Sequence, residues 1–209
     1  MSSKNYNVEL IIHITNLRLT CQHTYICETM GIEQEKVILV DSSDREVGTM
    51  EKIDAHRFGG TLHRAFSIFI FNSQGEMLLQ QRAISKYHSG GLFTNTCCSH
   101  PRPNEDILSA ANRRLQEEMG INCALKEIFS FEYRAALDHD LTEWELDHIF
   151  IGECDDLPEV NALEVESYKY VAIDWLLRDL ASNPNSYTEW FKASIEKVIE
   201  TRRDTHLKC

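Results

Sequence analysis

The 209-residue chain lacks several features that would assign it to a broad class of protein. No apolar run approaches the ~18 residues needed to span a bilayer, and no basic segment followed by an apolar core opens the chain, so we expect no secretory signal. Basic residues are scarce, with 21 Lys and Arg against 33 Asp and Glu and a net charge of −12. This charge disfavours nucleic acid and anionic membranes as partners.

The chain contains cysteines, but their spacing does not match a disulfide framework. The count of seven is odd, and the neighbours Cys97 and Cys98 are badly placed to bridge each other. Reduced thiols are typical of cytoplasmic proteins, so we expect a cytoplasmic location. The chain is long enough for one domain with a substantial core and too short for two large ones.

Hydrophobic patterns predict one α+β domain with a mixed sheet flanked by helices. A short buried strand is expected at 37–40, and a hairpin joins 66–71 to 77–82 through the turn-forming residues 72–75. Apolar residues at helical spacing predict a helix over 105–118, which Gly120 ends. Further strands are expected at 128–135, 145–151 and 168–173, and helices at 175–180 and 189–201.

We divide the chain into an N-terminal extension (1–36) whose role the sequence does not show, a domain over 37–201, and a tail over 202–209. Met30 lies just before the domain. We therefore hypothesise that translation normally starts there, which the intact mass of the natively expressed protein would test.

The most informative segment, 94–101, places a thiol two residues from an imidazole. If this segment is extended, Cys98 and His100 lie on the same face, because side chains alternate along a strand. The helix that follows carries Arg-Arg-Leu-Gln-Glu-Glu-Met-Gly-Ile at 113–121, an altered form of a diphosphate-handling signature. Thiol, metal ligand and diphosphate together indicate a narrow chemistry.

From these motifs the chain resembles the type I isopentenyl-diphosphate isomerases of the Nudix superfamily, over roughly residues 37–190. In the register of the Nudix box, Ser99 stands for the first Gly and Arg114 for a Glu with which Nudix hydrolases help to hold metal. The remaining box positions agree, at Glu105, Arg113, Glu117, Glu118, Gly120 and Ile121. The isomerases also lack the carboxylate that Arg114 replaces.

The resemblance implies a Nudix fold and the interconversion of isopentenyl and dimethylallyl diphosphate, a step in isoprenoid biosynthesis. Cys98 and Glu145 would be the two proton carriers on opposite faces of the substrate, with Tyr133 hydrogen-bonded to Glu145. The sequence does not tell which carrier donates. We expect Glu145, with Tyr133, to donate and Cys98 to act as the base. The alternative for Cys98 is a buried small apolar residue.

The resemblance also implies two metal positions. The first is a cage of His56, His63, His100, Glu143 and Glu145, which suits Mn²⁺, Zn²⁺ or Mg²⁺ with one coordination position open. Glu143 and Glu145 share one face of a strand, and we expect His56 and His63 on a loop. The second is a Mg²⁺ that arrives with the substrate and binds Glu118 and the backbone carbonyl of Cys98.

Lys52, Arg82, Lys86 and Ser99 match family positions that contact the diphosphate. Arg114 would add another cation, or would instead pair with a carboxylate of its own helix. Trp190 would stabilise a carbocation through its ring face, or would be a core residue of an amphipathic helix. His88 is expected to be structural. Its loop departs from many relatives, which have an aromatic residue, Pro and Gly where this chain has Ser89-Gly90-Gly91.

Two rival functions remain at the level of sequence. A Nudix pyrophosphohydrolase is disfavoured by Arg114 and by the separate His/Glu cage. A non-catalytic binding module that keeps the fold is disfavoured by the complete set of Cys98, His100, Glu143 and Glu145. We expect a monomer that binds a small diphosphate, with no nucleic-acid or membrane partner and no redox cofactor.

Overall fold

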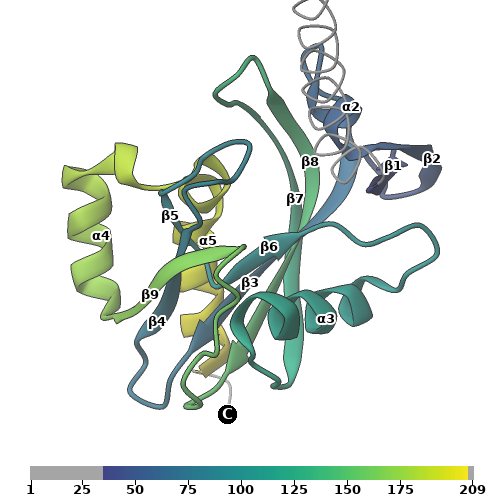
Figure 1. The fold of residues 1–209 in the computed structure, drawn as a ribbon. Coiled ribbons are helices and arrows are strands. Elements are labelled where there is room, and N and C mark those ends of the chain that lie inside the picture. Colours follow the sequence, from purple (N-terminus) through teal and green to yellow (C-terminus); the bar gives the residue numbers. More distant parts are fainter. Residues whose placement is uncertain (1–34, 207–209) are drawn as a thin grey trace, which may run out of the picture.

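The structure is a computed structural model that describes residues 35–206 (Figure 1). In these residues the elements are, in chain order, β1 (Lys36–Val40), β2 (Glu46–Glu51), α2 (Lys52–His56), β3 (His63–Phe71), β4 (Met77–Arg82), β5 (Phe93–Thr94), β6 (Cys97–Ser99), α3 (Ile107–Met119), β7 (Leu125–Ala136), β8 (Thr142–Glu153), β9 (Val165–Val171), α4 (Ile173–Ser182), the 3-10 turn η1 (Pro184–Ser186) and α5 (Glu189–His206).

Strand β3 is the centre of a nine-stranded mixed sheet in the described part of the chain. It pairs parallel with β8, from His63 opposite Glu145 to Phe71 opposite Glu153, and antiparallel with β1, β4 and β6. Strand β8 also pairs antiparallel with β7, and β4 with β9. Nearly every residue of β3 is buried, as expected for a strand covered on both faces.

Helices cover both faces of this sheet, so the domain has three layers (Figure 1). Because side chains alternate along β3, Ile68 packs with the helix α3 residue Leu115 in one core cluster. Phe69 packs with Phe191 of α5 in the other cluster. The expected α+β domain with a mixed sheet flanked by helices is confirmed.

Helix α3 begins and ends at residues suited to those positions. The carboxylate of Asp106 caps its first turn by accepting a hydrogen bond from the backbone N–H of Ser109, 3.0 Å away. Gly120 ends it with φ +68°, a left-handed conformation that glycine adopts without strain. A Cβ at Gly120 would also lie only 2.8 Å from the carbonyl oxygen of Glu159. The predicted stop at Gly120 is confirmed.

Several elements differ from the sequence-based expectations. Helix α5 continues to His206 rather than ending at Thr201, so it enters the expected C-terminal tail. The short elements β2, α2, β5 and β6 were not predicted as such. Residues 1–34, including Met30, lie outside the described residues. Among the residues that are described, no helix combines the length and the apolar character that crossing a bilayer requires.

Candidate active site

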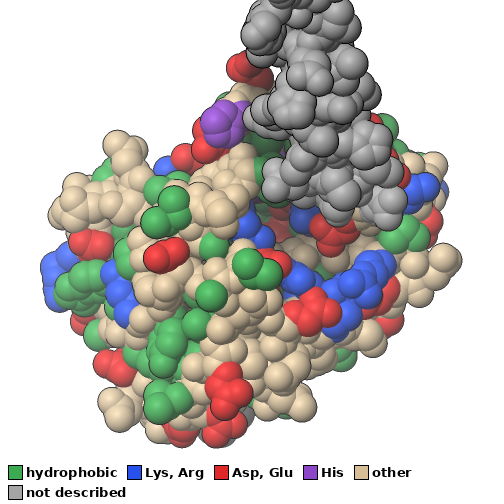
Figure 2. Space-filling view, in the orientation of Figure 1, with side chains coloured by type: hydrophobic (Ala, Val, Ile, Leu, Met, Phe, Trp, Pro, Cys, Tyr) green, Lys and Arg blue, Asp and Glu red, His purple; other side chains and the backbone are tan. Residues whose placement is uncertain are grey.

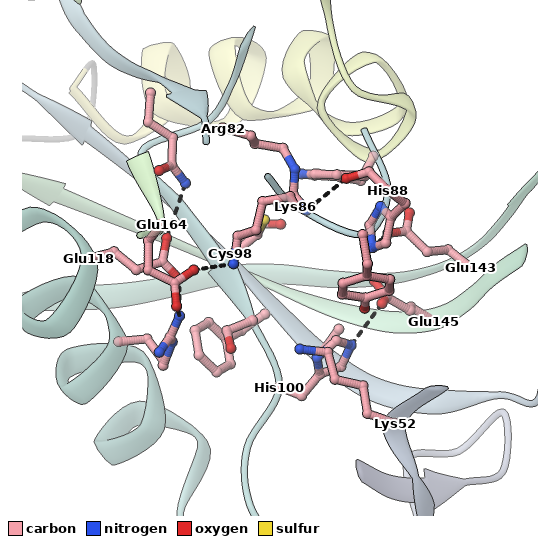
Figure 3. A pocket seen from close by; sticks show the side chains of 18 residues that line it. Lys52, Arg82, Lys86, His88, Cys98, His100, Glu118, Glu143, Glu145 and Glu164 are labelled. Carbon is pink, nitrogen blue, oxygen red and sulfur yellow. Dashed lines mark hydrogen bonds and ion pairs between the residues drawn. The ribbon is translucent and has the colours of Figure 1, made fainter. Parts of the chain in front are cut away.

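A cavity lies between β3, β4, β6, β8, α3 and the starts of α2 and α5 (Figure 3). The structure brings most of the predicted site residues into its wall: Lys52, Arg82, Lys86, Cys98, Ser99, His100, Arg114, Glu118, Glu143, Glu145 and Trp190. The other three, His56, His63 and Tyr133, contact wall residues, as the hydrogen bonds and ion pairs below show.

The thiol segment is extended at Cys97–Ser99, which meets the condition set by the sequence argument. Strand β6 runs antiparallel to β3 with Cys98 opposite Ser67, and both Cys98 and His100 line the cavity. Cys97 instead packs in the core beneath α3. Burial raises the pKa of the Cys98 thiol, and the nearby charge of Arg82 opposes that shift. The thiol is therefore protonated near neutral pH in this environment.

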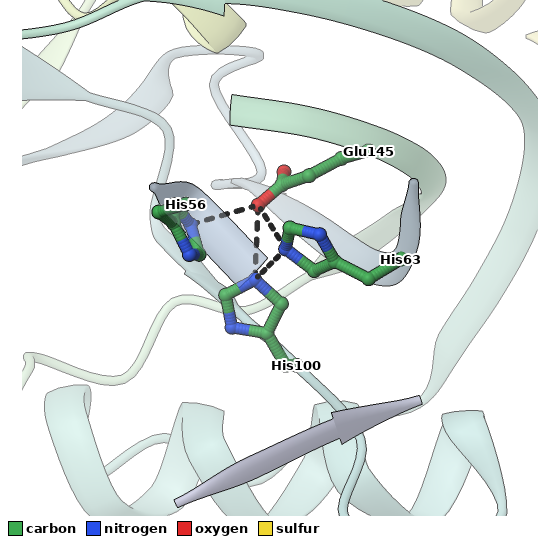
Figure 4. A group of neighbouring side chains, drawn as sticks. All are labelled: His56, His63, His100 and Glu145. Carbon is green, nitrogen blue, oxygen red and sulfur yellow. Dashed lines mark hydrogen bonds and ion pairs between the residues drawn. The ribbon is translucent and has the colours of Figure 1, made fainter. Parts of the chain in front are cut away.

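Four side chains from separate segments converge beside the cavity (Figure 4): His56, His63, His100 and Glu145. The sequence prediction that His56 and His63 lie on one loop was wrong. His56 is the last residue of α2 and His63 the first residue of β3, so only the segment between them is a loop. The pairing of β3 with β8 sets His63 directly opposite Glu145.

The donor atoms of this group fit a cation. Nδ1 of His56 lies 2.7 Å from the carbonyl oxygen of Lys52, and Nδ1 of His63 lies 2.7 Å from that of Thr61. Because a carbonyl only accepts, each Nδ1 carries the proton and each Nε2 presents a lone pair. These two Nε2 atoms lie 3.8 and 3.4 Å from Oε1 of Glu145, another acceptor.

Burial lowers the pKa of His56 to about 3, so its ring is neutral near pH 7. Its Nε2 is buried and has no hydrogen-bond partner. Acceptor atoms that face each other inside a protein repel unless a cation lies between them. Backbone carbonyls that fix the imidazole tautomer are typical of metal-binding histidines. The residues therefore fit a divalent metal ion.

Glu143 lies in a neighbouring group rather than in the four-residue group. Its donor atom groups with those of His56 and His88. Burial raises the pKa of Glu143, and the charge of Glu145 adds to the shift. Burial alone would also raise the pKa of Glu145, but the imidazole of His100, 2.9 Å from Oε1, holds it below its usual range.

Two of the basic side chains in the cavity wall already form ion pairs with carboxylates. Arg114 lies 2.5 Å from Glu118 and 3.2 Å from Glu164, and Lys86 also pairs with Glu164. Arg114 therefore pairs with carboxylates of its own helix, as one expected interpretation has it, and it also lines the cavity. On the face drawn in Figure 2, basic side chains lie beside acidic ones and form no continuous positive surface.

Trp190 is a core residue, as one expected interpretation has it, and it is also part of the cavity wall. It is 3% exposed and belongs to the core cluster around α5, yet it also lines the cavity. Its indole N–H donates to Oδ1 of Asn95 at 3.2 Å. The guanidinium carbon of Arg82 lies 5.1 Å from the centre of its ring, so this ring face already attracts a cation.

Sequence reasoning missed Glu164 and the position of His88. Both line the cavity, but Glu164 lies in the loop before β9 and belongs to no motif. His88 was expected to be only structural. Its position two residues after Lys86 was the one available signal that it reaches the same wall. Burial lowers the pKa of His88 to about 2, and Arg82 adds to the shift.

Comparison with known proteins shows the family to which the chain belongs. A family model described as the NUDIX domain matches residues 61–191. Isopentenyl-diphosphate Delta-isomerase 1 of Aromatoleum aromaticum is 52% identical over 171 residues, which cover 82% of this chain and 96% of the relative. Isopentenyl-diphosphate Delta-isomerase of Pectobacterium atrosepticum is 50% identical over 163 residues, which cover 78% of this chain and 90% of that relative.

Solved structures agree at the level of fold. A Deinococcus radiodurans protein, DR0079, superposes with a TM-score of 0.60 at 20% identity and covers 71% of this chain and 90% of its own. A MutT protein of Methanosarcina mazei superposes with a TM-score of 0.55 at 17% identity, and the match covers 69% of this chain and 95% of that protein. At such identities the likeness concerns the fold alone.

Proposed function

The chain belongs to the isopentenyl-diphosphate Delta-isomerase family, built on a NUDIX domain, and we propose that its cavity interconverts isopentenyl diphosphate and dimethylallyl diphosphate. The observation that carries the proposal is that Cys98 of β6 and Glu145 of β8 line one cavity together with basic side chains. A thiol and a carboxylate on different strands can transfer protons at two different carbon atoms of one small substrate. The basic side chains suit its diphosphate.

The reaction moves a carbon–carbon double bond by two proton transfers. A proton adds to the terminal carbon of the double bond and leaves a tertiary carbocation at the branched carbon. Loss of a proton from the carbon on the diphosphate side forms the new double bond. An alkene is a poor base, so the donating group must be held close and aligned.

Glu145, with Tyr133 as its hydrogen-bond partner, donates the first proton, and Cys98 removes the second. The hydroxyl of Tyr133 donates a hydrogen bond to Oε2 of Glu145 at 2.5 Å. Burial favours the protonated thiol, so Cys98 acts as a base only where cations oppose burial, and Arg82 is one that does. In the reverse direction the two residues exchange roles.

The diphosphate is held by Lys52, Arg82, Lys86, Ser99 and Arg114. Arginine presents a planar fork that matches phosphate oxygens, and lysine acts as a point charge. Trp190 supplies a ring face to the carbocation, worth ~2 kcal/mol in a dry pocket. A carbocation reacts with any water within reach, so the chemistry requires that water be excluded from the space between Cys98 and Glu145.

Two divalent ions would complete the site. His56, His63, His100, Glu143 and Glu145 would hold the first, and this mixture of imidazole and carboxylate donors suits Mn²⁺ or Zn²⁺. Glu118 and the Cys98 carbonyl would hold a Mg²⁺ that enters with the diphosphate. When bound, these ions alter the acidity of Glu145 and neutralise phosphate charge.

We also propose a cytoplasmic location and a monomeric state. The four cysteines in the described residues are all free, which supports a reducing compartment. Every side chain to which the proposal assigns a role belongs to a single copy of the chain, so the site needs no residue from a second copy.

Incubation of the metal-loaded protein with isopentenyl diphosphate in D₂O tests the proposal. Deuterium in the recovered dimethylallyl diphosphate is the expected result. Release of phosphate would indicate a pyrophosphohydrolase, and unchanged substrate would indicate a binding module. Removal of metal with a chelator should abolish turnover, and full turnover in metal-free protein would refute the cage.

A further inference from the structure

We propose that His88 is a sixth donor of the metal cage, so that the bound ion carries no water toward the cavity. The inference deepens the proposed function and rests on the proposed cage of His56, His63, His100, Glu143 and Glu145. It assigns a role to a buried cavity residue that the proton transfers and the diphosphate contacts leave unused.

The geometry around Glu143 carries the inference. Nε2 of His88 lies 4.0 Å from Oε1 of Glu143, and the two side chains are 5% and 6% exposed. This distance is too long for a hydrogen bond. It is close to twice the ~2.0–2.2 Å between a metal ion and an imidazole nitrogen or carboxylate oxygen. An ion between the two atoms would therefore be within bonding reach of both.

The donor atoms of His88, Glu143 and His56 lie within 4.8 Å of one another. His56 also belongs to the group with His63, His100 and Glu145, so the two groups share one imidazole. The six donor atoms do not all lie within 4.8 Å of one another, so a single ion would have to draw the two groups together. The rings of His56 and His88 are stacked with an angle of 27° between their planes. Because one nitrogen lone pair binds one ion, the shared His56 favours a single ion over two neighbouring ions.

One tautomer of His88 suits a ligand role. Its Nδ1 lies 3.3 Å from Oγ of Ser89, a hydroxyl that can accept a hydrogen bond from Nδ1–H or donate one to Nδ1. In the tautomer whose Nδ1 carries the proton, Nε2 presents its lone pair toward Glu143. His56 and His63 hold this tautomer, because their Nδ1 atoms contact carbonyl oxygens.

The loop around His88 is held in place at several points. Arg82 donates a hydrogen bond to the His88 carbonyl at 3.2 Å, and the backbone N–H of Ser89 donates to Asp138. Trp190 packs against the His88 ring with 6.0 Å between centroids. Gly90 approaches Ile84 so closely that a Cβ there would lie 2.6 Å from the Ile84 carbonyl oxygen. His88 is thus a fixed part of the wall.

A sixth protein donor has a chemical consequence. Five donors leave one position of an octahedral ion for water, and that water would lie beside the cavity that holds a carbocation. An ion with no bound water removes this nucleophile from the site. The ion would then act on Glu145 without offering an open position to the substrate.

Water-proton relaxation of the Mn²⁺-loaded protein tests the proposal, because Mn²⁺ speeds relaxation strongly only when it exchanges bound water. We expect weak enhancement in wild type and strong enhancement in His88→Ala and in His88→Phe, which keeps a ring of similar shape. The Mn²⁺ dissociation constant should rise at least about tenfold in both, since even residues around metal ligands contribute that much. His139→Ala, which removes a histidine with a 74% exposed side chain, should match wild type.

The outcomes separate this inference from the proposed function. If wild type and both His88 variants give equal relaxation and equal affinity, His88 is not a ligand and the five-donor cage stands. If wild type binds no Mn²⁺, the cage itself fails, and the proposed function fails with it. Far-UV circular dichroism confirms that the variants compared are folded, and His88→Phe decides the question if His88→Ala is unfolded.

Discussion

The hydroxyl oxygen of Tyr133 lies 2.5 Å from Oε2 of Glu145 and 3.0 Å from Oε2 of Glu143. The antiparallel pairing of β7 and β8 creates this contact by setting Tyr133 opposite Glu145. A hydroxyl carries one proton, so Tyr133 can donate to only one carboxylate at a time. Its position links a proposed proton carrier to a proposed metal ligand.

Tyr133→Phe should reduce kcat by about 10²-fold, the lower end of the range for a positioned proton-transfer group. KM and metal content should stay near wild type, because Tyr133 neither lines the cavity wall nor belongs to the four-residue cage. The ring also remains to pack against Phe131. Steady-state kinetics and metal analysis check both parts.

Tyr170→Phe is the matched control. Its hydroxyl donates to the carbonyl of Asp156 on an exposed part of the surface, so kcat should stay within about twofold. Loss of metal in Tyr133→Phe would instead mean that the hydroxyl serves the cage.

Cys98→Ala should keep the fold and the metal but lose nearly all turnover, because the base that removes the second proton is gone. Cys97→Ala changes the neighbouring thiol, which is fully buried beneath α3. It should cost about 1 kcal/mol of unfolding free energy and keep turnover within a few fold. Deuterium exchange into isopentenyl diphosphate measures the turnover of both variants, and urea unfolding measures the stability of Cys97→Ala. A fully active Cys98→Ala would overturn the assignment.

The sequence predicted the site through short motifs whose geometry is local. Alternation along a strand placed Cys98 and His100 on one cavity wall, and Glu143 and Glu145 both reach that wall. Gly120 marked a helix end because a left-handed conformation favours glycine. Each of these inferences needed only the spacing of residues within one element.

What the sequence did not predict depends on contacts between distant segments. Glu164 pairs with Lys86 across 78 positions of the chain, and no local pattern encodes that pairing. His88 reaches Glu143 only because the loop that carries it folds back onto β4. The five-residue helix α2 is too short to show a hydrophobic period, so His56 was expected on a loop.

Glu164→Gln should lower KM by about fivefold and leave kcat unchanged. The Glu164 carboxylate pairs with Lys86 and Arg114, so it competes with the diphosphate for these two cations. Removal of one such pair is worth about 1 kcal/mol. Glu166→Gln, on the exposed edge of β9, is the control and should match wild type. A higher KM in Glu164→Gln would mean that Glu164 positions Lys86 for the substrate instead.

Trp190→Ala should lower kcat by about 30-fold, which corresponds to a cation–π contribution of ~2 kcal/mol. Trp190→Phe keeps a ring face over the cavity and should lose only a few fold. Both variants lose the hydrogen bond to Asn95, so that bond does not distinguish them. Because Trp190 is also a core residue, kinetics should be measured at a temperature where thermal unfolding curves show both variants folded. Equal losses in kcat would contradict the role of the ring.

Glu105→Gln should destabilise the fold in a pH-dependent way. Glu105 forms a two-bond ion pair with Arg113, with distances of 2.7 and 2.8 Å, and fixes the segment before α3 to the helix. The Arg113 hydrogen bond is the main cause that lowers the pKa of Glu105. A carboxyl with a lowered folded-state pKa contributes stability above its unfolded value of about 4.3, and this contribution is lost as pH falls below it.

Urea unfolding at pH 7, 5, 4 and 3 should therefore show a penalty of about 1–2 kcal/mol for Glu105→Gln at pH 7 and 5. The penalty should shrink toward pH 3, because protonation weakens the same ion pair in wild type. Glu166→Gln removes one exposed carboxylate and should show no such trend. A penalty that stays constant from pH 7 to pH 3 would mean that Glu105 acts through its shape and hydrogen bonds alone, without its charge.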